Sequence, residues 1–195
     1  DTETYHPSRA TAEMRTRLTD GNPEAPLLTY IGRVSKEKDL KRLNNVMRLV
    51  RAECADARLA IVGDGPFLNE LKETFDPSFT VFTGYLSGEE LAAAFATGDV
   101  FLFPSATETL GLVALESFAS HVPVIGTRAG GIPFVIEDGV TGHLIDPDAG
   151  DAAWANAAIE LLQDSTRREN MGAAARCEAE KYSWVESTQA LLAAY

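Results

Sequence analysis

The sequence is poor in three features, and each shortage counts against a class of protein. Its 195 residues include only two cysteines, Cys54 and Cys177, which are too few and too far apart for a disulfide framework or a cysteine-based zinc site. Lysine and arginine number 17 against 29 acidic residues, a net charge of −12, which disfavours a nucleic-acid polymer as a partner. No apolar run approaches the roughly 20 residues that cross a bilayer.

The remaining composition is that of an ordinary globular protein. Hydrophobic residues make up 45% of the chain and charged residues 24%, which is enough apolar material for one folded core. The acidic excess is uneven, because residues 1–100 carry 12 basic and 16 acidic side chains whereas residues 101–195 carry 5 and 13. We therefore expect any anion site to use side chains of the first half or backbone amides.

The first 26 residues differ from the rest of the chain. They are polar and interrupted by prolines and Gly21, which predicts an interdomain linker and the start of a domain, with one short helix over residues 10–18. The chain begins without Met or a signal-like segment, so we expect it to be a piece of a longer protein. The domain itself is predicted to span residues 27–195.

From residue 27 onward, apolar runs of strand length alternate with segments of helical periodicity. The predicted strands are 27–31, 58–62, 79–82, 100–103, 122–126 and 142–145. The predicted helices are 39–53, 66–74, one beginning at Ser87, 110–119, 152–162, 166–181 and 184–194. This order predicts an α/β fold, a single Rossmann-like doubly wound parallel sheet of about six strands with extra carboxy-terminal helices. Ligands of such sheets bind beyond the carboxyl ends of the strands.

The turn after the first strand, residues 32–38, reads GRVSKEK. Gly32 permits close approach of a ligand to the backbone, and Arg33 and Lys38 flank a helix start, which is a reasonable anion cradle. The alternative is an ordinary solvated basic face, because further lysines and arginines lie nearby. The residues of this turn taken alone favour the alternative.

The turn after the second strand contains Gly63 and Gly65. It is not the dinucleotide-binding fingerprint, because Leu68 stands at the third glycine position, and no Gly-Lys-Ser/Thr tripeptide marks a P-loop. We interpret it as a tight turn that lets a ligand lie close to the backbone.

The turn after the fourth strand carries two carboxylates eight residues apart. Glu108 is expected at the mouth of a helix, and Glu116 lies within that helix in an apolar stripe, where a carboxylate needs a partner. Gly111 in the first helical turn costs about 1 kcal/mol relative to alanine, a cost that is easier to accept if its N–H serves a ligand. The alternative is helix capping by Glu108 and a local hydrogen bond for Glu116. Here we favour function.

Together these features resemble the carboxy-terminal, nucleotide-sugar-binding domain of retaining glycosyltransferases of family 4, which is half of a GT-B fold. The most specific match is the E-x7-E motif formed by Glu108 and Glu116. Gly32-Arg33 with Lys38, residues 63–66 (GDGP), 82–86 (FTGYL) and 129–133 (AGGIP) match in the same order. The resemblance covers essentially the whole chain. Within the family, residues 82–120 look most like the sulfolipid synthases, which transfer sulfoquinovose from a UDP donor to diacylglycerol.

The resemblance implies a role for each matched residue. Arg33 and Lys38 would bind the donor diphosphate and stabilise the charge on the leaving group, and Glu108 would bind hydroxyls of the donor sugar. Glu116 would bind the ribose. Other residues implied at the donor are Gly32, Gly63 and Gly65 near the nucleotide, Leu86 beside the base, and the N–H groups of Leu110, Gly111 and Leu112 facing the sugar and phosphate. No metal or other cofactor is implied, and UDP-sugar is the expected donor substrate.

The resemblance also implies partners and a location. The acceptor-binding amino-terminal domain would lie outside this chain, the acceptor could be a lipid, and the enzyme would lie on the cytoplasmic or stromal side, peripheral to a membrane through that other half. This chain alone is expected to bind donor with negligible turnover. The alternatives are half of a nucleotide-sugar epimerase or phosphorylase on the same fold, and a non-enzymatic nucleotide-binding module.

Four residues stand apart from this interpretation. Asp39 and His121 depart from the family's usual residues: an extra carboxylate at Asp39 would weaken phosphate binding, and His121 is expected to adopt left-handed geometry at a mild cost. His6 and His143 receive no role, because no acidic, serine or cysteine partner is expected beside them.

Overall fold

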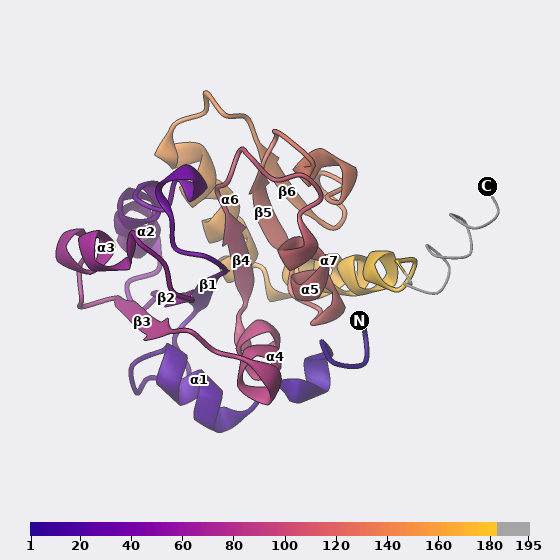
Figure 1. Cartoon of the computed structure of the whole chain (residues 1–195), viewed down its shortest axis with the longest axis horizontal. Coiled ribbons are helices and arrows are strands. Elements are labelled where there is room, and N and C mark those ends of the chain that lie inside the picture. The colour runs from indigo at the N-terminus through magenta and orange to yellow at the C-terminus, as the bar shows by residue number, and fades with distance from the viewer. Residues whose placement is uncertain (183–195) are drawn as a thin grey trace.

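Six parallel strands form one sheet in the order β3-β2-β1-β4-β5-β6 in the computed structural model, which describes residues 1–182 (Figure 1). The strands are β1 (Leu27–Ile31), β2 (Arg58–Val62), β3 (Thr80–Gly84), β4 (Val100–Phe103), β5 (Val124–Thr127) and β6 (Gly142–Ile145). The strand order reverses between β1 and β4, which is where doubly wound sheets bind ligands. The predicted fold class is confirmed.

Helices flank the sheet and pack in pairs, α2 against α6, α1 against α4, and α5 against α7. Their bounds are α1 (Ala12–Leu18), α2 (Arg42–Glu53), α3 (Leu68–Thr74), α4 (Gly88–Thr97), α5 (Leu112–Ala119), α6 (Asp151–Gln163) and α7 (Ser165–Ala179). Three short 3-10 helices are η1 (Pro7–Arg9), η2 (Lys36–Lys38) and η3 (Ile132–Phe134). The helix predicted at residues 184–194 lies outside the described residues.

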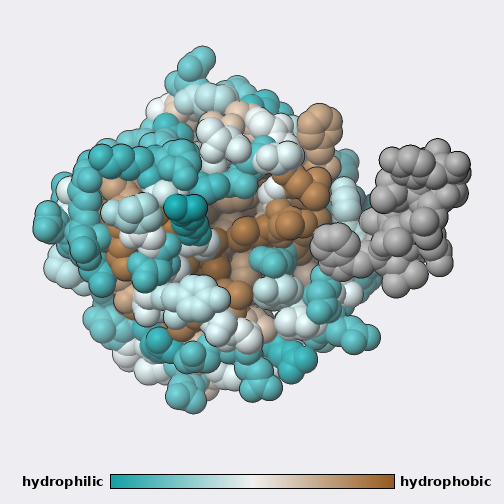
Figure 2. All heavy atoms as spheres, in the orientation of Figure 1, coloured by the Kyte–Doolittle hydropathy of each residue, from teal (hydrophilic) through white to brown (hydrophobic). Residues whose placement is uncertain are grey.

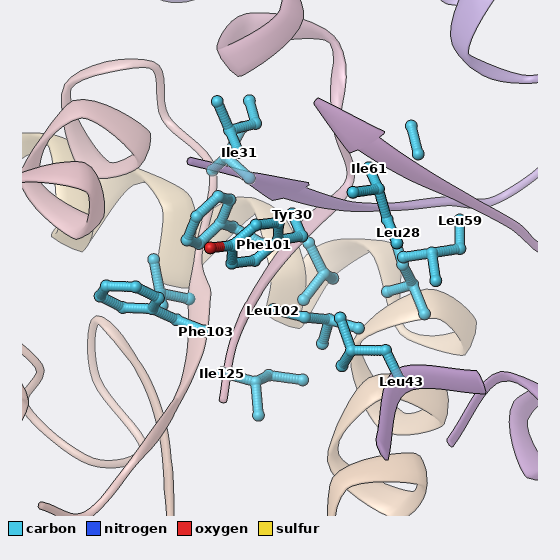
Figure 3. Packing of buried hydrophobic residues seen from close by; sticks show 14 of the residues in the cluster. Leu28, Tyr30, Ile31, Leu43, Leu59, Ile61, Phe101, Leu102, Phe103 and Ile125 are labelled. Carbon is cyan, nitrogen blue, oxygen red and sulfur yellow. The ribbon is translucent and has the colours of Figure 1, made fainter. Parts of the chain in front are cut away.

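The two central strands are buried along their whole length, because helices cover both faces of a doubly wound sheet. Figure 3 shows Tyr30 of β1 beside Phe101 and Phe103 of β4. The rings of Tyr30 and Phe101 are stacked with their centroids 6.4 Å apart. Tyr30 and Phe103 lie within the last two residues of β1 and β4, so the turns that follow the two strands start from a closely packed part of the core.

The segment before β1 is fastened to the sheet through one arginine. Arg15 of α1 pairs with Asp99 at 2.9 Å and donates hydrogen bonds to the carbonyl oxygens of Ala25 and Thr97. Asp99 in turn accepts a hydrogen bond from the N–H of Leu27 at the start of β1. The predicted short helix is therefore present, and it packs against the domain.

Helices α1, α2, α3 and α5 begin later than predicted: α1 begins at Ala12 rather than Ala10, α3 begins at Leu68 rather than Pro66, and α2 and α5 are each preceded by a residue with positive φ. Asp39 has φ of +50°, which separates η2 from α2, and Gly111 has φ of +70° and is the N-cap of α5. Gly111 is therefore not within the first helical turn, and the cost of a helical glycine does not apply. Ser87 is the N-cap of α4 as predicted, but its side chain makes no capping bond, and Glu90 pairs with Arg17 instead.

Candidate functional site

The turns after β1, β2 and β4 bring their polar residues to one edge of the sheet, where Figure 2 shows apolar surface in a hollow bordered by hydrophilic groups. An ion pair there joins Lys38 and Glu108, whose side chains are 19% and 18% exposed. The two residues lie 70 positions apart in the chain. The structure thus joins two residues to which the resemblance gives separate roles, one on the diphosphate and one on the sugar.

Arg33 is the second cation of the site, and it is exposed. Among the described residues no carboxylate forms an ion pair with it, so its guanidinium is available to an anion. Its backbone is held from below by the buried hydroxyl of Tyr30, which donates a 2.8 Å hydrogen bond to the Arg33 carbonyl oxygen. Burial, with the charge of Glu108 second, raises the pKa of Tyr30, so this hydroxyl keeps its proton at neutral pH.

A pocket of about 270 Å³ lies beside these residues. It is lined by Ile31, Gly32, Arg33, Val62, Gly63, Asp64, Tyr85, Leu86, Leu91, Phe95, Val113 and Glu116. Its volume falls near the lower end of the usual range for ligand pockets, about 300–1,000 Å³. A pocket of this size encloses a small ligand or one part of a larger one.

The pocket separates the predicted site residues into two groups. Gly32, Arg33, Gly63, Leu86 and Glu116 line it, whereas the others do not. The predicted residues outside the pocket are Lys38, Gly65, Glu108, Leu110, Gly111 and Leu112.

The residues that line the two cavities differ in part from the predicted site residues. Leu110 and Leu112 are about half exposed and line a second, apolar cavity together with Tyr5 and Tyr182. Sequence reasoning missed seven pocket residues, namely Ile31, Val62, Asp64, Tyr85, Leu91, Phe95 and Val113. Tyr85 lies in the matched segment 82–86 and is 75% exposed at the pocket rim, so that segment was the signal for it.

Glu116 shares the second cavity with a polar neighbour. The hydroxyl of Tyr5, from the start of the chain, lies beside its carboxylate. Burial is the main reason that the pKa of Glu116 is raised, and its interaction with Tyr5 acts in the opposite direction. Burial also raises the pKa of Tyr5 to about 12, with the charge of Glu116 adding to the shift.

Backbone contacts between turns explain several glycines of the matched motifs. A Cβ atom at Gly63 would overlap the carbonyl oxygen of Gly32, and one at Gly65 would overlap that of Val34. The same turns are joined by a 2.9 Å hydrogen bond from the N–H of Val34 to the carbonyl oxygen of Asp64. Glycine is therefore required at residues 63 and 65 by the neighbouring turn, whatever ligand is bound. Their closeness to a nucleotide stays a prediction.

The segment after β5 supports the turn that carries Glu108 in the same way. The N–H of Gly131 donates a 2.7 Å hydrogen bond to the carbonyl oxygen of Glu108, and a Cβ atom there would overlap the carbonyl oxygen of Thr109. A Cβ atom at Gly130 would lie 2.6 Å from the same Glu108 oxygen. The matched AGGIP segment therefore fixes the position of Glu108.

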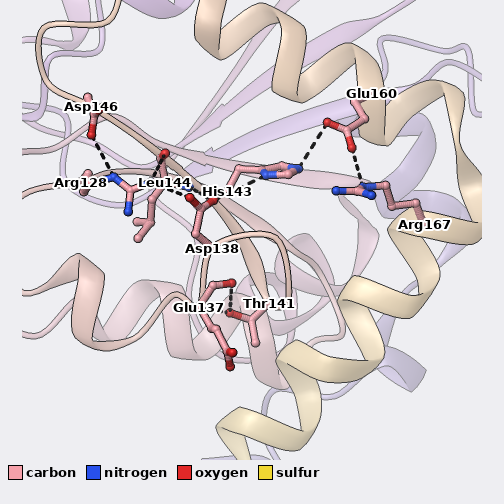
Figure 4. Close-up of polar contacts among 9 residues, drawn as sticks. All are labelled: Arg128, Glu137, Asp138, Thr141, His143, Leu144, Asp146, Glu160 and Arg167. Atoms are coloured by element: carbon pink, nitrogen blue, oxygen red, sulfur yellow. Dashed lines mark hydrogen bonds and ion pairs between the residues drawn. The ribbon is translucent and has the colours of Figure 1, made fainter.

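A separate polar network lies between β6 and α6 (Figure 4). His143 lies 3.7 Å from the carboxylates of Asp138 and Glu160, and these acids pair with Arg128 and Arg167, each at 2.5 Å. The expectation that His143 has no acidic partner is therefore wrong, because strand β6 brings it between two carboxylates that the sequence separates.

The other two histidines also have partners in the structure. His6 contacts the hydroxyl of Ser8 at 2.8 Å, which corrects the same expectation for that residue. His121 has φ of +67°, as predicted, and contacts Glu169 at 3.0 Å. Neither histidine lines the pocket. Asp39, the other departure from the family, pairs with Arg42 at 3.1 Å.

In the part of the chain that the structure describes, no group of three or more His, Cys, Asp or Glu side chains could hold a metal ion. Within the same residues, no helix is both long enough and apolar enough to cross a membrane.

The six-stranded parallel sheet has the Rossmann-like fold of GT-B glycosyltransferase carboxy-terminal domains. A family model described as glycosyl transferases group 1 matches residues 25–164, and the chain belongs to that family. The chain is 45% identical to the sulfoquinovosyl transferase SQD2 of Arabidopsis thaliana over 96% of its own length and 36% of the relative's. It is 33% identical to a GDP-mannose-dependent alpha-mannosyltransferase of Corynebacterium glutamicum, over 100% of its own length and 45% of the relative's.

Among solved structures, the Anabaena protein Alr3699/HepE, in complex with UDP and glucose, superimposes with a TM-score of 0.83. The match is 21% identical and covers 99% of this chain and 53% of that protein, so it shows the shared fold. The chain spans less than half the length of both curated relatives.

The contact at Gly131 yields a stability prediction. Gly131→Ala should lower the free energy of unfolding by about 1–3 kcal/mol, because the added methyl overlaps the Thr109 carbonyl oxygen and displaces the Glu108 turn. Gly150→Ser is the control, since Gly150 has a negative φ, no heavy atom lies within 4 Å of its Cβ position, and serine is favoured at this N-cap of α6. Urea unfolding of both variants would measure the difference. Equal stability of the two variants would show that the turn yields without cost.

Proposed function

We propose that this chain is the donor-binding part of a retaining glycosyltransferase whose donor is a UDP-sugar. The observation that carries the proposal is the Lys38–Glu108 pair beside a pocket that also holds Arg33 and Glu116. In this proposal Arg33 and Lys38 bind the diphosphate, Glu108 binds hydroxyls of the donor sugar, and Glu116 binds the ribose. The solved relative fold that holds UDP and glucose supports this assignment.

In this proposal the nucleoside occupies the pocket, with Glu116 accepting hydrogen bonds from ribose hydroxyls and Leu86 beside the base. The diphosphate lies toward Arg33 and Lys38, and the first N–H groups of α5, which have no partner within the helix, face it. Glu108 binds a sugar hydroxyl. This arrangement places each chemical part of the donor against a group of matching charge.

The residues of the turn after β1 supply the catalytic effect. As the bond between the sugar and the diphosphate breaks, negative charge grows on the departing phosphate, and Arg33 and Lys38 stabilise that charge where it develops. The acceptor attacks on the face from which the diphosphate leaves, which retains the configuration of the sugar. No metal is needed for this role in the proposal, because two side-chain cations serve it.

The finer proposal is transfer of sulfoquinovose to diacylglycerol, and the 45% identity with a sulfoquinovosyl transferase supports it. The mannosyltransferase relative is named for GDP-mannose, so base and sugar are the features to test. The acceptor site and any membrane attachment are assigned to the other domain of a longer protein, which leaves this chain able to bind donor but not to turn it over. Activity in the presence of that domain would exclude a purely binding module, and its product would exclude a phosphorylase or epimerase.

Nucleotide titration tests the proposal directly. The chain should bind UDP and UDP-sugars in calorimetry, and Glu116→Ala should weaken both uridine and UDP. Arg33→Ala should weaken UDP by about 10-fold and leave uridine unchanged, because a charge-assisted bond to phosphate is worth roughly 1.5–3 kcal/mol. Arg48→Ala, an exposed arginine on α2, removes the same charge away from the pocket and should change neither. Absence of binding to UDP, GDP and their sugars at millimolar concentration would reject the proposal.

The Lys38–Glu108 pair predicts opposite effects on two ligands. Glu108→Gln should tighten UDP binding by about 3-fold, because Lys38 no longer has to share its ammonium with a carboxylate. The same variant should lose most of the extra affinity that a sugar adds to UDP. Glu53→Gln, which removes an exposed charge on α2, controls for net charge. Weaker binding of UDP itself by Glu108→Gln would contradict the competition.

A further inference from the structure

The start of the chain is tied to the helix that carries Glu116. Arg176 of α7 donates hydrogen bonds to the carbonyl oxygens of Thr2 at 3.1 Å and Tyr5 at 3.0 Å, and the same nitrogen contacts the carbonyl oxygen of Ala119 at the end of α5. A single guanidinium thereby joins residues 2–5, α5 and α7. The entry segment, residues 1–9, is therefore held at a fixed place relative to α5.

The side chain of Tyr5 extends from this anchor to the rear of the pocket. Its ring meets the ring of Phe95 edge to face, with centroids 5.2 Å apart and an interplanar angle of 82°. Phe95 lines the nucleotide pocket, and Tyr5 lines the second cavity, so the two rings lie on either side of the wall between them. Glu116 lines both cavities, and the Tyr5 hydroxyl lies beside it.

The half-buried carboxylate of Glu116 lines both cavities, so it can accept hydrogen bonds from groups in either one. The apolar surroundings of Glu116 disfavour its charged form, and the Tyr5 hydroxyl offsets part of that cost. A carboxylate has two oxygens and can accept several hydrogen bonds, so Tyr5 leaves acceptor capacity for a ligand in the pocket. Phenylalanine would fill the same space against Phe95, so the hydroxyl is the part of Tyr5 that acts on the site.

We infer that Tyr5 is a positioning residue for Glu116, and that through it the entry segment responds to nucleotide in the pocket. The inference rests on the proposed function, because it assigns Glu116 to the ribose hydroxyls. Glu116 lines both cavities, and in the proposed function the ribose occupies the first while Tyr5 lines the second, so a nucleotide that fixes Glu116 also fixes Tyr5. Because coupling between two sites is reciprocal, a displaced entry segment weakens nucleotide binding. The chain of contacts therefore runs from pocket to Glu116, to Tyr5, to residues 1–9.

The test compares Tyr5→Phe with wild type and with Tyr182→Phe. Tyr182 lines the same second cavity, so this control removes a hydroxyl there without touching Glu116. Calorimetry with UDP at pH 7 should show about 2- to 10-fold weaker binding for Tyr5→Phe, the range that corresponds to one hydrogen bond, and no change for the control.

A titration from pH 4.5 to 8 distinguishes positioning from a general structural effect. Without the Tyr5 donor the charged form of Glu116 is less stable, so its pKa rises and UDP affinity should begin to fall at a higher pH in Tyr5→Phe than in wild type. Hydrogen exchange supplies a second measurement, in which UDP should slow exchange of residues 1–9 in wild type and have a smaller effect on them in Tyr5→Phe.

The outcomes separate the two proposals. Suppose that wild type binds UDP, and that Tyr5→Phe has the same UDP affinity, the same pH at which this affinity begins to fall, and the same hydrogen exchange of residues 1–9. The inference is then wrong and the proposed function stands. Equal weakening by Tyr5→Phe and Tyr182→Phe also overturns it. If wild type binds neither uridine nor any nucleoside diphosphate, the proposed function fails and the positioning role fails with it.

Discussion

The site depends on backbone packed directly against backbone. At Gly63 and Gly131 there is no room for a Cβ atom, because the carbonyl oxygens of Gly32 and Thr109 occupy the space. These contacts join the turn after β1 to the turn after β2, and the turn before α5 to the segment after β5. Four chain segments are thereby fixed at the carboxyl edge of the sheet before any ligand contributes energy. Such preorganisation lowers the entropic cost of binding.

The chain has a net charge of −12, so an anionic ligand depends on the few cations at the site. In the structure Lys38 is paired with Glu108, whereas Arg33 forms no ion pair with a carboxylate of residues 1–182. In the proposed function, a diphosphate brings the charge that draws Lys38 away from Glu108. The buried aromatic rings of Tyr30 and Phe101 lower the local dielectric constant, so charge–charge interactions near them are stronger than in water.

The strands were the most predictable part of the fold. Four of the six have the predicted bounds, because continuous apolar runs such as 27–31 and 100–103 end at glycine or proline. Strand β5 begins two residues late, since the N–H of Val122 bonds to Ser117 and closes α5. Helix starts were less predictable, because positive φ values are tertiary outcomes. The residues at the site could be named from motifs, but their partners could not. Lys38 meets Glu108 across 70 positions, and nothing local in the sequence encodes that contact.

The glycine contacts restrict how this site can diverge among related sequences. A substitution at Gly131 forces the turn at Thr109 to move, so such positions can change only in concert, which single mutations rarely achieve. Exposed side chains at the same edge of the sheet, such as Arg33 and Tyr85, carry no such restriction. Evolution can therefore exchange the groups that recognise a ligand while the path of the main chain stays fixed. In the proposed function, donor preference then changes through exposed side chains while the main chain keeps its path.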